Sequence, residues 1–141
     1  MSQENLEIIR QAFEAFNRGE PEMFLKLYDE DIVLHIGPPS IDAGSYYGAE
    51  EVERQYARLF APFGATYRIE IAELIDAGDS VLVFSRAKGR GRRSGVEVEG
   101  PLACGIFTMR GGKIIRIDHP ADRAEALAAV GLSEQDAHAD S

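Results

Sequence analysis

Helical and strand-like patterns occupy separate parts of this sequence. Apolar residues recur at helical spacing in residues 6–16, 23–28 and 49–60. From residue 66 to residue 118 the pattern changes to short strand-like segments, some alternating and some apolar throughout, which glycine-containing turns separate. Helices that precede consecutive strands joined by tight turns predict an α+β domain, with the N-terminal helices packed on one face of a curved, mainly antiparallel β-sheet.

Proline and glycine set the boundaries of the individual segments. Residues 37–48 show no clear period and are predicted to form a loop, of a length at which loops often cover sites. A last helix is predicted to begin near Asp122 and to end at Gly131. Residues 1–132 are predicted to form a single domain, followed by a flexible tail over residues 133–141. Strands are predicted for residues 31–36, 66–75, 80–88, 96–109 (interrupted at Gly100-Pro101) and 113–118.

Charge and composition exclude several classes of function. The net charge of −9 disfavours binding to nucleic acid or to anionic membranes. No apolar run approaches the roughly 20 residues that cross a membrane, and the N-terminus shows no signal-peptide pattern. The single cysteine, Cys104, allows no intramolecular disulfide, so a cytoplasmic location is predicted. No spacing of histidine, cysteine or carboxylate residues is typical of a metal site, and neither a metal nor a cofactor is predicted.

Two predicted strands are apolar on both faces. Apolar residues occur at both parities within residues 81–84 and 103–107. The predicted N-terminal helices can cover only one of these faces. The other face is therefore expected to pack against a second copy of the chain, which predicts a homodimer.

Four motifs resemble those of a known family. They are FxxFNxGE at residues 13–20, YxED at 28–31, YGAEEV at 47–52 and GGKIIRIDHPADRAEALAAVGL at 111–132. Over about residues 4–132 the chain resembles SnoaL-like proteins of the nuclear transport factor 2-like superfamily. The resemblance implies a cone-shaped fold in which a curved sheet wraps around helices and encloses an apolar pocket, and dimerisation through the outer sheet face. The superfamily includes isomerases, cyclases, epoxide hydrolases, dehydratases and non-enzymes, so the motifs indicate a fold more than a reaction.

The resemblance can be followed residue by residue. Three positions that ketosteroid isomerases use for catalysis align with Ala12, Ile36 and Cys104. Because all three functional residues are replaced, the chain is not expected to be a ketosteroid isomerase by the usual mechanism. The acid/base aspartate of SnoaL-type cyclases aligns with His119, and the second catalytic residue of these cyclases, a histidine, aligns with Gly105.

Residues suited to proton transfer lie where the last predicted strand ends. Residues 113–118 alternate, so Ile115, Ile117 and His119 are expected on one face, and Asp118 is expected to point away. A histidine can take or give a proton near neutral pH. The competing interpretation is that Asp118 and His119 only close the strand.

Strand alternation and the resemblance together predict which side chains line the pocket. His119 is predicted to be a general base, and Arg86 or Tyr56 is predicted to stabilise an oxyanion. Structural roles remain open for each of them, such as an exposed histidine at residue 35 or a core cysteine at residue 104. The predicted catalytic residues are His119, His35 and Arg86, and the predicted substrate-binding residues are Tyr56, Phe16, Phe84, Cys104, Ile106, Ile117 and Phe60.

The first functional hypothesis is a cofactor-free enzyme of the cyclase or isomerase type, using acid/base chemistry on a small, largely apolar carbonyl compound. Lyase and hydrolase reactions remain open. Two alternatives are a pocket that binds an apolar metabolite without catalysis and a dimeric assembly domain. An inward-facing His119 on a polar pocket floor favours the enzyme.

Overall fold

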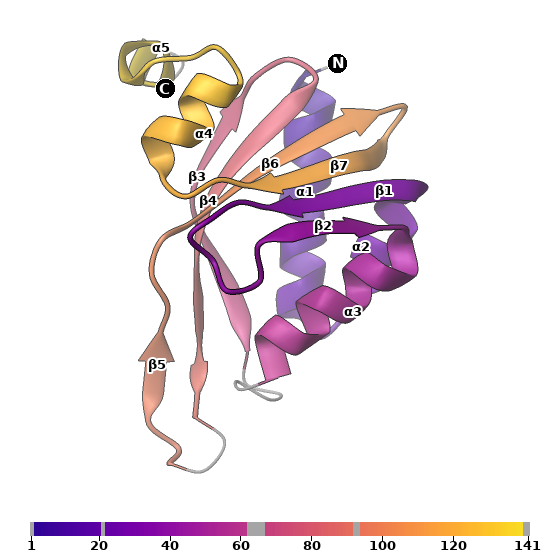
Figure 1. Ribbon diagram of the computed structural model, residues 1–141, viewed down its shortest axis with the longest axis vertical. Coiled ribbons are helices and arrows are strands. Elements are labelled where there is room, and N and C mark those ends of the chain that lie inside the picture. The colour runs from indigo at the N-terminus through magenta and orange to yellow at the C-terminus, as the bar shows by residue number, and fades with distance from the viewer. Residues whose placement is uncertain (1, 21, 62–66, 92–93, 140–141) are drawn as a thin grey trace.

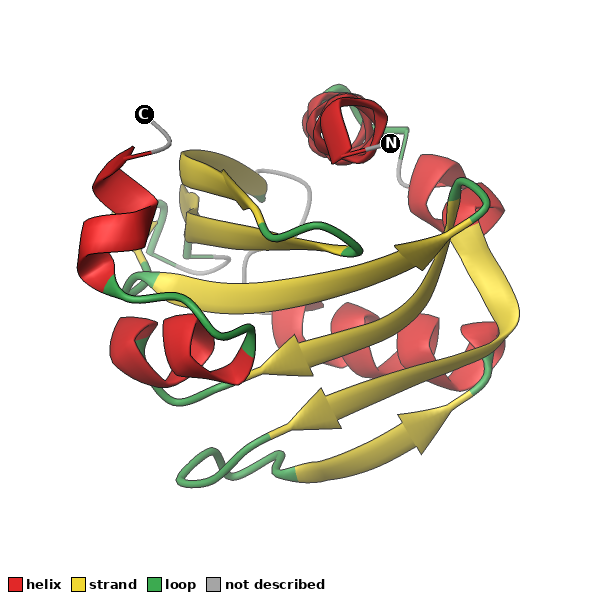
Figure 2. Ribbon diagram, turned by 90° about the horizontal axis from the view of Figure 1, so that it is seen from above, coloured by secondary structure: helices red, strands yellow, loops and turns green. Residues whose placement is uncertain are grey.

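One curved, mixed sheet of seven strands organises the fold (Figures 1 and 2). The computed structural model describes residues 2–20, 22–61, 67–91 and 94–139. The helices are α1 (Ser2–Asn17), α2 (Glu22–Leu27), α3 (Ala49–Phe60), α4 (Arg123–Ala129) and α5 (Glu134–Ala139). The strands are β1 (Tyr28–Ile36), β2 (Gly44–Tyr47), β3 (Arg68–Asp76), β4 (Ser80–Arg90), β5 (Glu97–Glu99), β6 (Ala103–Arg110) and β7 (Lys113–His119).

The strands follow in the order β2-β1-β7-β6-β4-β3, and β5 pairs with β4. Strands β3, β4, β6 and β7 form antiparallel neighbours, as the turns between them predict. The first and last strands, β1 and β7, pair in parallel, with Ile36 opposite His119. The fold class predicted from the sequence is confirmed, because helices pack against a curved, mainly antiparallel sheet that does not close.

Helices α1, α2 and α3 cover one face of the sheet, which we call the inner face. Ile9 and Phe13 of α1 and Val52 of α3 are buried against strand residues of this face. Burial of this kind contributes roughly 1.5–3 kcal/mol for each large apolar side chain. The buried strand residues of the inner face are Ile32, Leu34, Ile36, Val81, Val83, Phe107, Met109, Ile114 and Ile117.

The opposite, outer face carries a second apolar cluster beneath α4. Leu127 of α4 is 2% exposed and packs with Ala126 against this face. The strand residues in this cluster are Ile75, Leu82, Phe84, Cys104 and Ile106. Helices therefore lie on both faces of the two-sided apolar strands, and the expectation that one face lacks a helix is wrong. The homodimer stays a prediction, without the support of an uncovered face.

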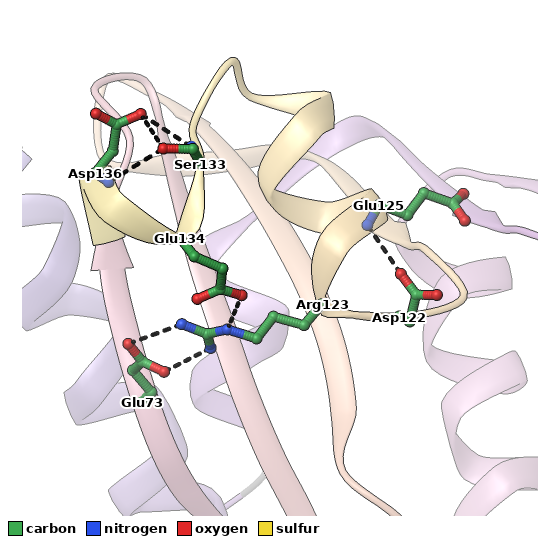
Figure 3. Close-up of polar contacts among 7 residues, drawn as sticks. All are labelled: Glu73, Asp122, Arg123, Glu125, Ser133, Glu134 and Asp136. Carbon is green, nitrogen blue, oxygen red and sulfur yellow. Dashed lines mark hydrogen bonds and ion pairs between the residues drawn. The ribbon is translucent and has the colours of Figure 1, made fainter. Parts of the chain in front are cut away.

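Arg123 attaches the C-terminal helices to the sheet (Figure 3). Its Nη1 lies 2.6 Å from a carboxylate oxygen of Glu73 on β3, and its Nε lies 2.7 Å from a carboxylate oxygen of Glu134 on α5. The guanidinium also lies 4.6 Å from the centre of the Phe84 ring, at a distance typical of a cation–π contact. The segment predicted to be a flexible tail thus contains a helix with an ion pair to α4, while its flexibility stays a prediction.

Three local features differ from the sequence-based expectation. Strand β1 begins at Tyr28, and the predicted loop of residues 37–48 contains the short strand β2. A bulge in β7 leaves Ile115 without a partner, because Thr108 pairs with Arg116 and Met109 pairs with Ile114. Ile115 is therefore not part of the inner-face cluster, whereas its neighbour Ile114 is.

Asn17 protects the open edge of the sheet at β3. Its side-chain amide donates to the carbonyl oxygen of Ile69 (2.7 Å), and its carbonyl oxygen accepts from the Ile69 N–H (2.8 Å). The side chain thus occupies the two backbone groups that an added strand would use. Asn17→Ala is expected to lower the free energy of unfolding by about 1 kcal/mol and to speed hydrogen exchange at the Ile69 amide. Gln11→Ala, on the exposed side of α1, is the control, and equal exchange at Ile69 in the two variants would contradict this role.

Candidate active site

A hydrogen bond between α3 and the end of β7 defines the candidate site. The Tyr56 hydroxyl oxygen lies 2.7 Å from Nε2 of His119, although 63 positions separate the two residues. Both residues are partly buried. Tyr56 belongs to the inner-face cluster, so the His119 ring lies on the inner face as predicted. We call these two residues the Tyr56–His119 pair.

The second ring nitrogen of His119 fixes its tautomer. Nδ1 lies 2.9 Å from the backbone carbonyl oxygen of Cys104. A carbonyl oxygen can only accept, so Nδ1 carries a hydrogen. In the neutral ring, Nε2 is then the acceptor, and the Tyr56 hydroxyl donates to it.

Aromatic rings surround Tyr56. Phe60 stacks on Tyr56 at 5.8 Å between ring centres and on Tyr67 at 4.1 Å. Phe16 of α1 packs edge-to-face with both Phe60 and Tyr67. These rings provide an apolar wall beside the Tyr56–His119 pair, which suits a ligand with an apolar body and one polar group.

Burial keeps both members of the pair neutral. It lowers the pKa of His119 below its usual value of 6.5, although the Cys104 carbonyl and the charge of Asp118 act in the opposite direction. Burial raises the pKa of Tyr56 well above its usual value, and the neighbouring Tyr28 and Tyr67 raise it further. The pair therefore holds one exchangeable hydroxyl proton and one basic nitrogen without a net charge.

The structure divides the predicted site residues between the two faces. On the inner face lie His119, Tyr56, Phe16, Phe60 and Ile117. On the outer face lie His35, Arg86, Phe84, Cys104 and Ile106. The predicted pocket placement of Arg86, Phe84, Cys104 and Ile106 is therefore wrong. For His35, a position outside the pocket was the alternative left open, and the structure shows that alternative.

The surroundings of His35 and Arg86 show why these two side chains do not meet His119. His35 lies between the inward residues Leu34 and Ile36, and its Nδ1 is 3.0 Å from the Ser45 hydroxyl. Arg86 follows the outward Phe84 by two positions, and its Nε is 3.8 Å from a carboxylate oxygen of Glu99. Both side chains therefore extend away from the Tyr56–His119 pair.

The expected orientation of Asp118 is confirmed. Its carboxylate accepts two hydrogen bonds of 2.9 Å from the Arg116 guanidinium. Asp118 pairs in register with the outward His35, so its side chain lies on the outer face. It influences His119 through its charge and not through a contact within the site.

Two site residues were not predicted from the sequence. Tyr67 stacks on Phe60, and Tyr28 lies close enough to raise the pKa of Tyr56. Tyr67 directly precedes β3 and lies in the alternating pattern of residues 66–75, which indicated that it is buried but not which residues it contacts. Tyr28 lies at the junction of α2 and β1, where the helical pattern gave no sign of a site.

Two surface hollows lie away from the pair. One, of about 370 Å³, lies against β4 and β5, and the other, of about 490 Å³, lies between α1 and β3. Neither is lined by Tyr56 or His119. Among the residues that the structure describes, no group of three or more histidine, cysteine or carboxylate side chains could hold a metal ion. Over the same ranges, no helix has the length and apolar character needed to cross a membrane.

The low pKa of His119 predicts a pH dependence of stability. At pH values just below 6.5 the unfolded chain binds a proton on this ring, while the folded protein binds it only at lower pH. The free energy of unfolding should therefore fall as the pH drops below about 6.5, and this contribution should end once the folded ring is also protonated. The free energy of unfolding, measured by urea denaturation across this range, should fall less for His119→Gln than for the wild-type protein. Wild-type and variant curves that stay parallel below pH 6.5 would contradict the burial of the ring.

The fold and part of the sequence match known proteins. Residues 9–117 match the family described as the SnoaL-like domain, and no curated protein matches the chain. Bal32a, from a soil-derived mobile gene cassette, is 24% identical with a TM-score of 0.70, covering 84% of this chain and 89% of its own. A putative SnoaL-like polyketide cyclase from Jannaschia sp. CCS1 is 18% identical with a TM-score of 0.70 and 94% coverage of both chains.

A third neighbour, TerC co-crystallised with polyporic acid, is 22% identical with a TM-score of 0.66, covering 84% of this chain and 91% of its own. At these identities the structural neighbours establish a shared fold. The family match covers more than half of the sequence, including the strands that carry the inner face. The chain therefore belongs to the SnoaL-like domain family.

Proposed function

We propose that the protein is a cofactor-free acid/base enzyme of the cyclase or isomerase type, acting on a small, largely apolar carbonyl compound. The observation that supports this proposal is the 2.7 Å hydrogen bond from the Tyr56 hydroxyl to a His119 ring with a fixed tautomer. The aromatic wall of Phe16, Phe60 and Tyr67 suits the apolar part of such a compound.

The geometry favours Tyr56 as the residue that contacts the substrate. The single lone pair of His119 Nε2 already accepts the Tyr56 hydroxyl, so the ring has no free acceptor for a substrate proton. The Tyr56 oxygen still has lone pairs. A carbon-bound proton next to the substrate carbonyl passes to this oxygen while the hydroxyl proton passes to Nε2. Tyr56 stays neutral, His119 becomes an imidazolium, and the C–H electron pair forms the enolate.

The surroundings of His119 suit this transient positive charge. The Cys104 carbonyl accepts from Nδ1, and the charge of Asp118 also favours the protonated ring. Burial of the ring opposes the positive charge, so return of the proton to the substrate is favourable. Return to another carbon isomerises the compound, and attack of the enolate on a second carbonyl group closes a ring. The putative polyketide cyclase among the structural neighbours supports a carbonyl-bearing substrate.

Binding without catalysis is the second candidate. The apolar wall of Phe16, Phe60 and Tyr67 favours it, because apolar rings can bind an apolar ligand without any proton transfer. A dimeric assembly role, the homodimer and a cytoplasmic location stay predictions from the sequence.

Exchange of carbon-bound protons tests catalysis without knowledge of the natural substrate. The protein is incubated in D₂O with a panel of aromatic ketones and 1,3-diketones, and loss of the α-proton signal is followed by NMR. Wild-type protein is expected to accelerate exchange for at least one compound by about 10²-fold or more over His119→Gln. Equal rates for the two proteins across the panel would contradict the enzymatic proposal. Saturable binding of the same compounds without exchange would support the second candidate.

A further inference from the structure

Gly105 of β6 lies directly beneath the His119 ring. Ile106 pairs with Asp118 and Phe107 pairs with Ile117, so the next position, Gly105, faces His119 across the two strands. The His119 ring folds back over this glycine, because its Nδ1 bonds the carbonyl of the preceding residue, Cys104.

A side chain at this position would crowd the ring. A Cβ atom added to Gly105 would lie 3.3 Å from His119 Cε1 and 3.6 Å from Nδ1. It would also lie 3.0 Å from Cε1 of Phe107, which is 6% exposed and packs edge-on against Phe13. The 3.0 and 3.3 Å contacts are tighter than ordinary van der Waals packing, so the Phe107 and His119 rings would each have to shift by a few tenths of an ångström.

The imidazole has little freedom to move without losing one of its two hydrogen bonds. Hydrogen bonds of 2.7 Å to Tyr56 and 2.9 Å to the Cys104 carbonyl hold its two nitrogens. A displacement that clears a Cβ atom lengthens at least one of them. If the hydrogen bond to the Cys104 carbonyl is lost, the ring hydrogen is no longer fixed on Nδ1. If the hydrogen bond to Tyr56 is lost, the two members of the pair separate.

We propose that Gly105 is the positioning residue of the Tyr56–His119 pair, because its lack of a side chain leaves the space in which the imidazole binds both partners. The inference deepens the proposed function and rests on it for its catalytic meaning. The glycine has no ordinary conformational reason to be there, since it lies within a regular strand and its φ is not positive.

The first test is the ring tautomer. Nitrogen-15 NMR of His119 is expected to show the single Nδ1–H tautomer in the wild-type protein and a mixture of tautomers in Gly105→Ala. Gly100→Ala is the matched control, because a Cβ there meets nothing closer than 3.7 Å. A wild-type tautomer pattern in folded Gly105→Ala would overturn the proposal.

The second test covers the case in which Gly105→Ala folds poorly. Gly105→Ala is made in the wild-type background and in a His119→Ala background, and the shift in Tm is compared. The shift is expected to be smaller by half or more when the ring is absent, and folding rescued by His119→Ala would support the proposal equally. The same loss in both backgrounds, including failure to fold in both, would show that Gly105 serves Phe107 instead and would overturn the proposal.

These measurements are independent of turnover. If no ketone exchanges its protons but Gly105→Ala changes the His119 tautomer, the enzymatic proposal fails and the positioning role stands. If exchange occurs and Gly105→Ala retains both the wild-type rate and the tautomer, the positioning role fails and the enzymatic proposal stands.

Discussion

Replacing Tyr56 by phenylalanine is expected to slow proton exchange about as strongly as His119→Gln does, by about 10²- to 10⁴-fold. The reason is that the Tyr56 hydroxyl donates to the only acceptor nitrogen of the ring, so the substrate meets the tyrosine oxygen first. Phenylalanine retains the stacking on Phe60 and removes only the oxygen. The exchange rates of the two variants, measured on the same ketone, provide the comparison.

Tyr47→Phe is the matched control for this prediction. Tyr47 lies on the edge strand β2 and is 64% exposed, so removal of its hydroxyl should leave the exchange rate unchanged. If Tyr56→Phe retains the wild-type rate while His119→Gln is inactive, the substrate contacts His119 directly, and the relay through Tyr56 is wrong.

The largest expected effect on stability is that of Leu127→Ala in α4. Leu127 is 2% exposed and packs among Leu82, Phe84 and Ile106 on the outer face. Truncation of a buried leucine removes transfer free energy and leaves a cavity, which together cost about 2–5 kcal/mol. Urea denaturation monitored by circular dichroism measures the free energy of unfolding of both proteins.

Ala128→Ser, on the exposed side of the same helix, is the control and is expected to change this free energy by less than about 0.5 kcal/mol. Equal stability of Leu127→Ala and Ala128→Ser would mean that α4 does not form part of the core. No helix of the same chain would then cover the apolar outer face, and packing of this face against a second copy would again be a reason to predict a homodimer.

The fold was largely predictable because its signals are local. The predicted bounds of α3 at residues 49–60 match the structure, and Asp122 caps α4 by accepting from the Glu125 N–H (2.9 Å). Strand β2 was missed because its sequence is only Gly44–Tyr47, and its pairing with β1 depends on the fold rather than on its own pattern. The bulge at Ile115 was missed because it depends on the register with β6.

The site was only partly predictable because strand faces depend on register. The apolar centre of β4 contains Val81 and Val83 on the inner face and Leu82 and Phe84 on the outer face. Because both sets are apolar, the alternation of residues did not indicate which set faces the N-terminal helices. A choice that is wrong by one residue exchanges every side chain between the faces. The face on which His119 lies was predicted correctly because the buried Ile117 marks that face.

The parallel pairing of β1 with β7 has a consequence for how the chain folds. Without β7, the sheet falls into two separate pieces, because β1 would keep only β2 as its partner, and β6, β4 and β3 would form the other piece. A chain still being synthesised therefore cannot join its first strands to the rest of the sheet until residues 113–119 have emerged. Since His119 is the last residue of that strand, the Tyr56–His119 pair forms only when these two pieces come together.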